Sequence, residues 1–120
     1  MIQEIREWFE GVLPDRVRAN PRTIRGVRGT VLFRITGERA ESWTVRIEDP
    51  ALHAEPTEIS RPDLTLTLDR EAFLAIANGT VTGAAAYKQG KVKVGGNLLL
   101  GLQIAGLLEA RPPSPSDDFV

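Results

Sequence analysis

The chain has 120 residues, which fits one domain able to bury roughly two-thirds of the surface that its unfolded form exposes. Its 15 basic and 16 acidic residues leave a formal net charge of −1, so the strongly basic footprint of a general nucleic-acid binder is missing. The absence of cysteine excludes disulfides, thiolate catalysis and cysteine-ligated zinc.

The first residues do not resemble a secretory signal, because acidic residues stand within the first helical turns and no long apolar core follows. No stretch reaches the ~20 apolar residues that a membrane-spanning helix needs. We therefore expect a cytoplasmic protein.

The first segment has the three- and four-residue spacing of an amphipathic helix. Gly11 and Pro14 are expected to end or bend it, and a short helical turn is expected over residues 14–19. The apolar positions of the first helix are Ile2, Ile5, Trp8, Phe9, Val12 and Leu13.

Apolar residues at every second position then predict strands. Residues 29–37 and 42–48 are expected to form a hairpin with one buried face, and a third strand over residues 51–58 should give way to an edge or loop at Pro56. Residues 64–68 form the clearest strand of the chain. The inward positions of the hairpin are Val31, Phe33, Ile35, Trp43, Val45 and Ile47, and those of the later strand are Leu64, Leu66 and Leu68.

Two short helices are expected next. Asp69 is placed to cap a helix that ends at Asn78-Gly79, and Thr82 is placed to cap an alanine-rich turn that ends at Gly90. The small residues at 84–86 allow close approach to another element or to a ligand.

We expect the rest of the fold to be arranged around residues 85–108, which include the last helix. A short strand over residues 91–94 is bounded by glycines suited to positive φ, and Asn97 is placed to cap a helix over residues 98–110. That helix has two apolar faces, and leaving one leucine exposed forgoes roughly 1.5 to 3 kcal/mol of burial, so the second face needs an apolar partner. The first face comprises Leu100, Ile104, Leu107 and Leu108; the second comprises Leu98, Leu99 and Leu102.

The order of elements predicts an α+β fold with an antiparallel or mixed sheet of about five strands and helices on one side. Three stretches also resemble the sterol-carrier-protein type 2 domain, also called the non-specific lipid transfer family. These are residues 62–68, the helix over residues 69–77 with its Asn-Gly stop, and residues 87–97, where an aromatic, Gly-Lys, an alternating strand and Gly-Asn precede a leucine-rich helix.

The resemblance spans about residues 2–110. It implies a mainly antiparallel sheet whose helices enclose a hydrophobic tunnel that the last helix helps to close. We expect a single domain over residues 1–110. Residues 111–120 lack the hydrophobic residues that a core needs, which predicts a disordered tail.

The sequence contains no recognisable catalytic site. His53 is the sole histidine, no nucleophile pairs with a base, and no set of residues predicts a metal or cofactor site. The resemblance therefore implies a protein that is not an enzyme and binds or transfers lipids or fatty acyl chains. The expected ligand-binding residues are Phe33, Trp43, Phe73, Ile76, Leu100, Ile104, Leu107 and Leu108. The alternative is a homodimeric or accessory interaction module with a filled core, whose interface is the second face of the last helix.

Basic residues are concentrated between positions 15 and 34, which contain six arginines and one acidic residue. They form either a solvated face or a docking site for anionic membranes, where each basic residue contributes about 1 kcal/mol. The arginines are Arg16, Arg18, Arg22, Arg25, Arg28 and Arg34, and Lys88, Lys91 and Lys93 are candidates to join them in space.

Overall fold

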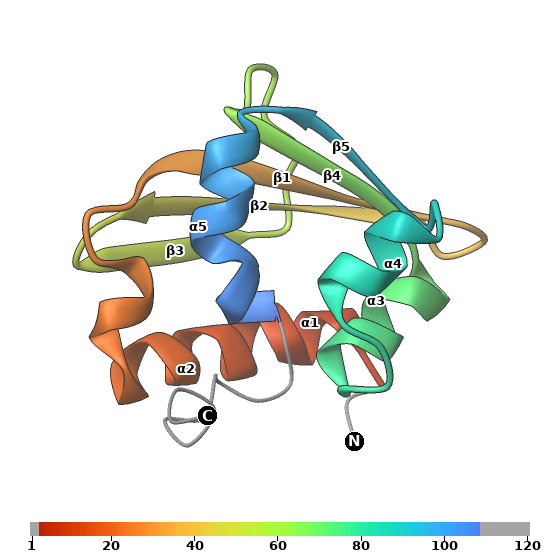
Figure 1. Cartoon of the computed structure of the whole chain (residues 1–120), viewed down its shortest axis with the longest axis horizontal. Helices are drawn as coiled ribbons and strands as arrows, with labels where there is room; N and C mark the ends of the chain where they lie inside the picture. The colour runs from red at the N-terminus through yellow and green to blue at the C-terminus, as the bar shows by residue number, and fades with distance from the viewer. Residues whose placement is uncertain (1–2, 109–120) are drawn as a thin grey trace.

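The computed structural model describes residues 3–108, except for the side chains at positions 106 and 108. The predicted tail over residues 111–120 and the end of the last predicted helix lie outside the described residues. Five strands form one sheet in the order β3-β2-β1-β4-β5, and the labelled helices lie on one side of it (Figure 1). The strands are β1 (Arg28–Thr36), β2 (Glu41–Glu48), β3 (Ala51–Glu55), β4 (Leu64–Asp69) and β5 (Val92–Gly96).

The sheet is mainly antiparallel, and β1 with β4 is its parallel pair. In the hairpin, Phe33 of β1 lies opposite Trp43 of β2, and Val31 lies opposite Val45. All four side chains are buried on the face that the helices cover, as the alternation predicts. The α+β fold expected from the sequence is therefore confirmed.

The N-terminal helical segment differs from the prediction. It consists of α1 (Ile5–Glu7), a π-helical turn η1 (Trp8–Val12) and α2 (Leu13–Ala19), followed by the 3₁₀ helix η2 (Pro21–Ile24). The sequence left open an end or a bend near Gly11 and Pro14; helical geometry does not end there, and the helical turn predicted for residues 14–19 is present within α2. The backbone N–H of Leu13 bonds to the carbonyl of Trp8, five residues back, so the wider π turn carries the chain into Pro14 near the start of α2.

Aromatic rings fill the core between α1–η1 and the sheet. The Phe9 ring stacks on Trp43 with centroids 4.8 Å apart, and it meets Trp8 edge to face at 5.0 Å. Phe33 and Phe73 complete the cluster, with centroids 5.1 Å and 5.5 Å from that of Phe9. This packing fixes the first helical segment against the sheet.

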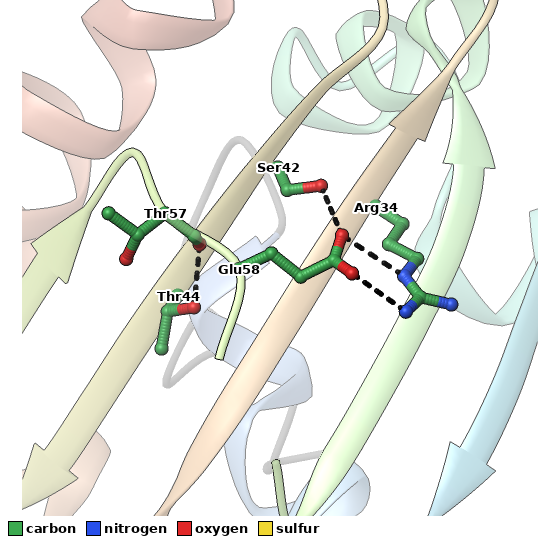
Figure 2. Close-up of polar contacts among 5 residues, drawn as sticks. All are labelled: Arg34, Ser42, Thr44, Thr57 and Glu58. Carbon is green, nitrogen blue, oxygen red and sulfur yellow. Dashed lines mark hydrogen bonds and ion pairs between the residues drawn. The ribbon is translucent and has the colours of Figure 1, made fainter. Parts of the chain in front are cut away.

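The chain crosses the outer face of the sheet between β3 and β4. Thr44 Oγ1 donates a hydrogen bond to the Thr57 carbonyl at 2.7 Å, and the Glu58 carboxylate accepts bonds from Arg34 and Ser42 at 2.9 Å each (Figure 2). The crossing segment, which connects β3 to β4, therefore lies across β2 and β1, and β4 then pairs with β1 in parallel. Thr44 is buried on this outer face.

The remaining helices are α3 (Arg70–Ala77), α4 (Gly83–Lys88) and α5 (Leu98–Leu108). The three predicted caps are confirmed. Asp69 accepts from Ala72 N at 2.7 Å, Thr82 accepts from Ala85 N at 3.0 Å, and Asn97 accepts from Leu100 N at 3.2 Å. The positive φ angles of the predicted glycine stops, Gly79 and Gly90, are 79° and 77°.

Candidate functional site

An apolar cavity of about 390 Å³ lies between the sheet and the helices α3, α4 and α5. Its volume falls in the range of roughly 300 to 1,000 Å³ that small-molecule sites occupy. Its wall is formed by Trp8, Phe33, Leu66, Leu68, Phe73, Ile76, Ala77, Gly83, Ala84, Tyr87, Val92, Val94, Leu98, Gly101, Leu102 and Ala105.

Three neighbouring strands supply the sheet side of this wall. Phe33 of β1 pairs with Leu66 of β4, and Leu66 pairs in turn with Val94 of β5. Leu68 and Val92 form the next pair along β4 and β5. Because alternate residues of a strand point to the same face, this register produces one continuous apolar surface.

Small residues on the helices leave the space open. Ala77 of α3, Ala84 of α4, and Gly101 and Ala105 of α5 all line the cavity. Ala84 is therefore beside the cavity, as the sequence suggested for residues 84–86, whereas Ala86 is fully buried. Larger side chains at these positions would fill the space, so the cavity follows from the choice of small residues.

Among the described residues, the cavity wall has no charged side chain, and Tyr87 and Trp8 are its members with a polar side-chain atom. Trp8 is 1% exposed, and its Nε1 has no hydrogen-bond partner among the described residues. Leaving such a donor unsatisfied costs about 1 to 3 kcal/mol.

The structure divides the predicted ligand-binding residues into two sets. Phe33, Phe73 and Ile76 line the cavity. Trp43 is buried against Phe9 and does not line it, while the side chain of Leu108 lies outside the described residues.

The other members of the predicted set lie on α5. Leu100, Ile104 and Leu107 are 1% to 3% exposed and pack into the core on the side of α5 away from the cavity wall. The cavity is bordered instead by Leu98 and Leu102, which the sequence assigned to the second apolar face. Periodicity shows that a helix has two apolar faces, but it does not show which one meets the core and which one borders a cavity.

Sequence reasoning missed Trp8 as a wall residue. It was assigned to the amphipathic first helix, and its spacing there is that of an ordinary core position. No local signal distinguishes a core tryptophan from one that borders a cavity, because the difference depends on what the neighbouring elements leave empty.

The arginines do not form one free basic face. Arg16 Nη1 donates to the Leu107 carbonyl at 2.7 Å and so ties α2 to α5. Arg18 pairs with Asp15, Arg28 pairs with Glu48 at 2.9 Å, and Arg34 pairs with Glu58 at 2.9 Å. In contrast, Lys88, Lys91 and Lys93 form no ion pair with any described residue.

No group of three His, Cys, Asp or Glu residues within 3–108 is arranged to hold a metal ion. None of the helices there combines the length and apolar character needed to cross a membrane.

The sequence is similar to known proteins over most of its length. The model of the SCP-2 sterol transfer family matches residues 11–109. Human sterol carrier protein 2 is 25% identical over 87 residues, which are 70% of this chain and 16% of that protein. Rat hydroxysteroid dehydrogenase-like protein 2 is 24% identical over 88 residues, which are 71% of this chain and 16% of that protein. The chain thus spans about one sixth of the length of these curated relatives.

Solved structures share the fold. The structure of palmitated SCP2L2 from Aedes aegypti has a TM-score of 0.73 and 28% identity, covering 90% of this chain and 97% of that one. Sterol carrier protein 2 from Yarrowia lipolytica in its apo form has a TM-score of 0.64 and 22% identity, covering 87% and 83%. The chain therefore belongs to the SCP-2 sterol transfer family, a family of lipid-binding and lipid-transfer domains.

Proposed function

We propose that this protein binds the acyl chain of a fatty acid or lipid in the cavity between its sheet and α3, α4 and α5, and that it acts by binding and transfer without catalysis. The observation that carries the proposal is the cavity of about 390 Å³ whose wall has no charged side chain. Family membership supports the ligand class, and the relative from Aedes aegypti is described as palmitated.

The driving force is the removal of methylene groups from water. About ten buried methylenes would contribute roughly 8 kcal/mol at ~0.8 kcal/mol each. The lost freedom of the ligand offsets at least ~4 kcal/mol of this, so burial of ten methylenes alone gives a Kd of about 1 mM or weaker, and tighter binding requires further contacts. With only two polar side-chain atoms in the wall, we expect little discrimination between head groups.

The absence of charge in the cavity wall also supports a role without catalysis. A general acid or base must stand within hydrogen-bonding reach of the proton that it transfers. Among the wall residues that the structure describes, only Tyr87 and Trp8 have a polar N–H or O–H in their side chains, and neither has a charged neighbour in that wall. The interaction module with a filled core does not account for the empty volume, so we do not propose it.

Titration with a fluorescent fatty acid tests the proposal. Ala77 is 4% exposed on α3 and lines the cavity, whereas Ala75 on the same helix does not. In Ala77→Leu the added carbons occupy ligand space. Losing two or three buried methylenes, or about 2 kcal/mol, weakens binding by about thirtyfold.

Ala75→Leu is the matched control, since it adds the same carbons to the same helix away from the cavity. We expect it to bind like the unchanged protein. Absence of saturable binding in the unchanged protein, or equal loss in both variants, would refute the proposal.

A further inference from the structure

The mouth of the cavity is surrounded by exposed apolar side chains. Tyr87, Leu98, Leu99 and Leu102 are 56%, 59%, 63% and 76% exposed, and they are the large hydrophobic residues that the described part of the chain exposes to this degree. Tyr87, Leu98 and Leu102 also line the cavity, so its opening lies within this group. We call these four residues the mouth patch.

The segment that carries the mouth patch is basic. Residues 72–108 contain three lysines and no aspartate or glutamate. Lys88 follows Tyr87 at the end of α4, and Lys91 lies in the turn between α4 and β5, an edge strand of the sheet. Lys93 lies on β5 between Val92 and Val94, which line the cavity, so its side chain points to the opposite face of the sheet. All three are exposed and unpaired among the described residues.

One acidic residue whose backbone contacts this segment is engaged elsewhere. The backbone of Asp63 approaches Gly96, but its carboxylate Oδ2 accepts hydrogen bonds from Thr30 N at 2.8 Å and Thr30 Oγ1 at 3.1 Å. The segment that carries the mouth patch therefore combines exposed apolar surface with the positive charge of Lys88 and Lys91.

We propose that the mouth patch docks on an anionic lipid bilayer, with its apolar side chains among the acyl chains and Lys88 and Lys91 at the head-group phosphates. The docking surface deepens the proposed function and rests on it, because a docked mouth lets an acyl chain pass between bilayer and cavity without crossing water. Burying each exposed leucine favours binding by about tenfold, and each lysine near an anionic surface adds about fivefold.

A second copy of the chain fits this surface less well than a bilayer does. A two-fold contact through the mouth patch brings the same surface of both copies together. The unpaired lysines of the two copies would then approach one another, and like charges oppose that association. Anionic lipid instead supplies the opposite charge around an apolar centre.

Vesicle flotation tests the docking. The unchanged protein should float with vesicles of phosphatidylcholine and phosphatidylserine, bind weakly to phosphatidylcholine alone, and bind less as salt is raised. Leu99→Gln should lower binding to the mixed vesicles by about tenfold. Leu99 is suitable because it belongs to the mouth patch but does not line the cavity.

Charge is tested with two matched double variants. Lys88→Gln and Lys91→Gln together should abolish the preference for phosphatidylserine. Arg22→Gln and Arg25→Gln remove the same charge from exposed arginines that form no ion pair among the described residues, and this variant should keep the preference.

Three results would overturn the docking surface: equal loss in the lysine and arginine variants, unchanged flotation of Leu99→Gln, or a dimer in sedimentation that Leu99→Gln dissociates. Titration with a fluorescent fatty acid in vesicle-free solution separates this proposal from the proposed function. Leu99→Gln should bind the fatty acid like the unchanged protein. Flotation without fatty-acid binding would refute the proposed function alone, and fatty-acid binding without flotation would refute the docking alone.

Discussion

At the scale of single residues, Glu58 connects the crossing segment to the sheet. Its carboxylate accepts hydrogen bonds from Arg34 Nε at 3.3 Å, Arg34 Nη2 at 2.9 Å and Ser42 Oγ at 2.9 Å. The Arg34 hydrogen bonds, followed by that of Ser42 and the Arg34 charge, hold the pKa of Glu58 below its usual value of 4.5. The folded state therefore favours the charged carboxylate.

This preference makes stability depend on pH. A lowered pKa in the folded state contributes stability above the unfolded pKa, and that contribution is lost as the pH falls through the folded pKa. We expect the free energy of unfolding to fall as the pH drops below about 4.5 and Glu58→Gln to show a weaker fall. The difference should be small because the pair is exposed.

Urea unfolding across this pH range measures the effect. Glu38→Gln, in the turn between β1 and β2, removes an exposed carboxylate that forms no ion pair among the described residues, and it serves as the control. Equal pH dependence of Glu58→Gln and the unchanged protein would show that Glu58 does not couple to folding.

At the scale of the elements, the Gly-Gly-Asn turn decides where α5 begins. Gly96 has a φ of 96°, and a Cβ built on it collides with the backbone carbonyl of Asp63. The Asn97 N–H bonds to that same carbonyl at 2.8 Å, and the Asn97 side chain caps α5. Because Gly96 has no side chain, the first turn of α5 can lie against β4, beside the cavity.

Replacing this glycine tests the argument. Gly96→Ala should lower the free energy of unfolding by about 2 kcal/mol or more, because it combines a disfavoured φ with a backbone collision. Gly95→Ala is the control, since a Cβ at Gly95 meets nothing within 4 Å. Thermal or urea unfolding gives both values, and equal losses would contradict a special role for Gly96.

Local sequence signals predicted most elements because their physical causes are local. Asp69, Thr82 and Asn97 cap helices with their own side chains, and the alternation in β1 and β4 marks their buried faces. The helical turn after Pro14 was predicted, but the π turn that joins it to the first helix was not, because the residue pattern does not show it.

At the scale of the whole molecule, the arrangement of the layers was predicted better than the cavity. The hydrophobic pattern and the resemblance together gave an α+β fold with helices on one side of the sheet. The cavity wall depends on which face of α5 is turned to the core, and this is set by contacts with elements distant in sequence, such as the bond from Arg16 to the Leu107 carbonyl. Of the residues predicted to bind the ligand, Phe33, Phe73 and Ile76 line the cavity, whereas Leu100 packs into the core.

The central claim is that an acyl chain occupies this cavity, and the two tryptophans allow it to be located. Trp8 lines the cavity, whereas Trp43 does not and is covered by the Phe9 ring. A fatty acid with bromine atoms midway along its chain quenches an indole that it contacts. Trp43→Phe leaves Trp8 as the emitter, and Trp8→Phe leaves Trp43.

Quenching of these two folded single-tryptophan variants by the brominated fatty acid is the most direct measurement. Our account predicts strong, saturable quenching of Trp8 and weak quenching of Trp43. Equal quenching of both, or stronger quenching of Trp43, would contradict it and place the acyl chain elsewhere on the protein.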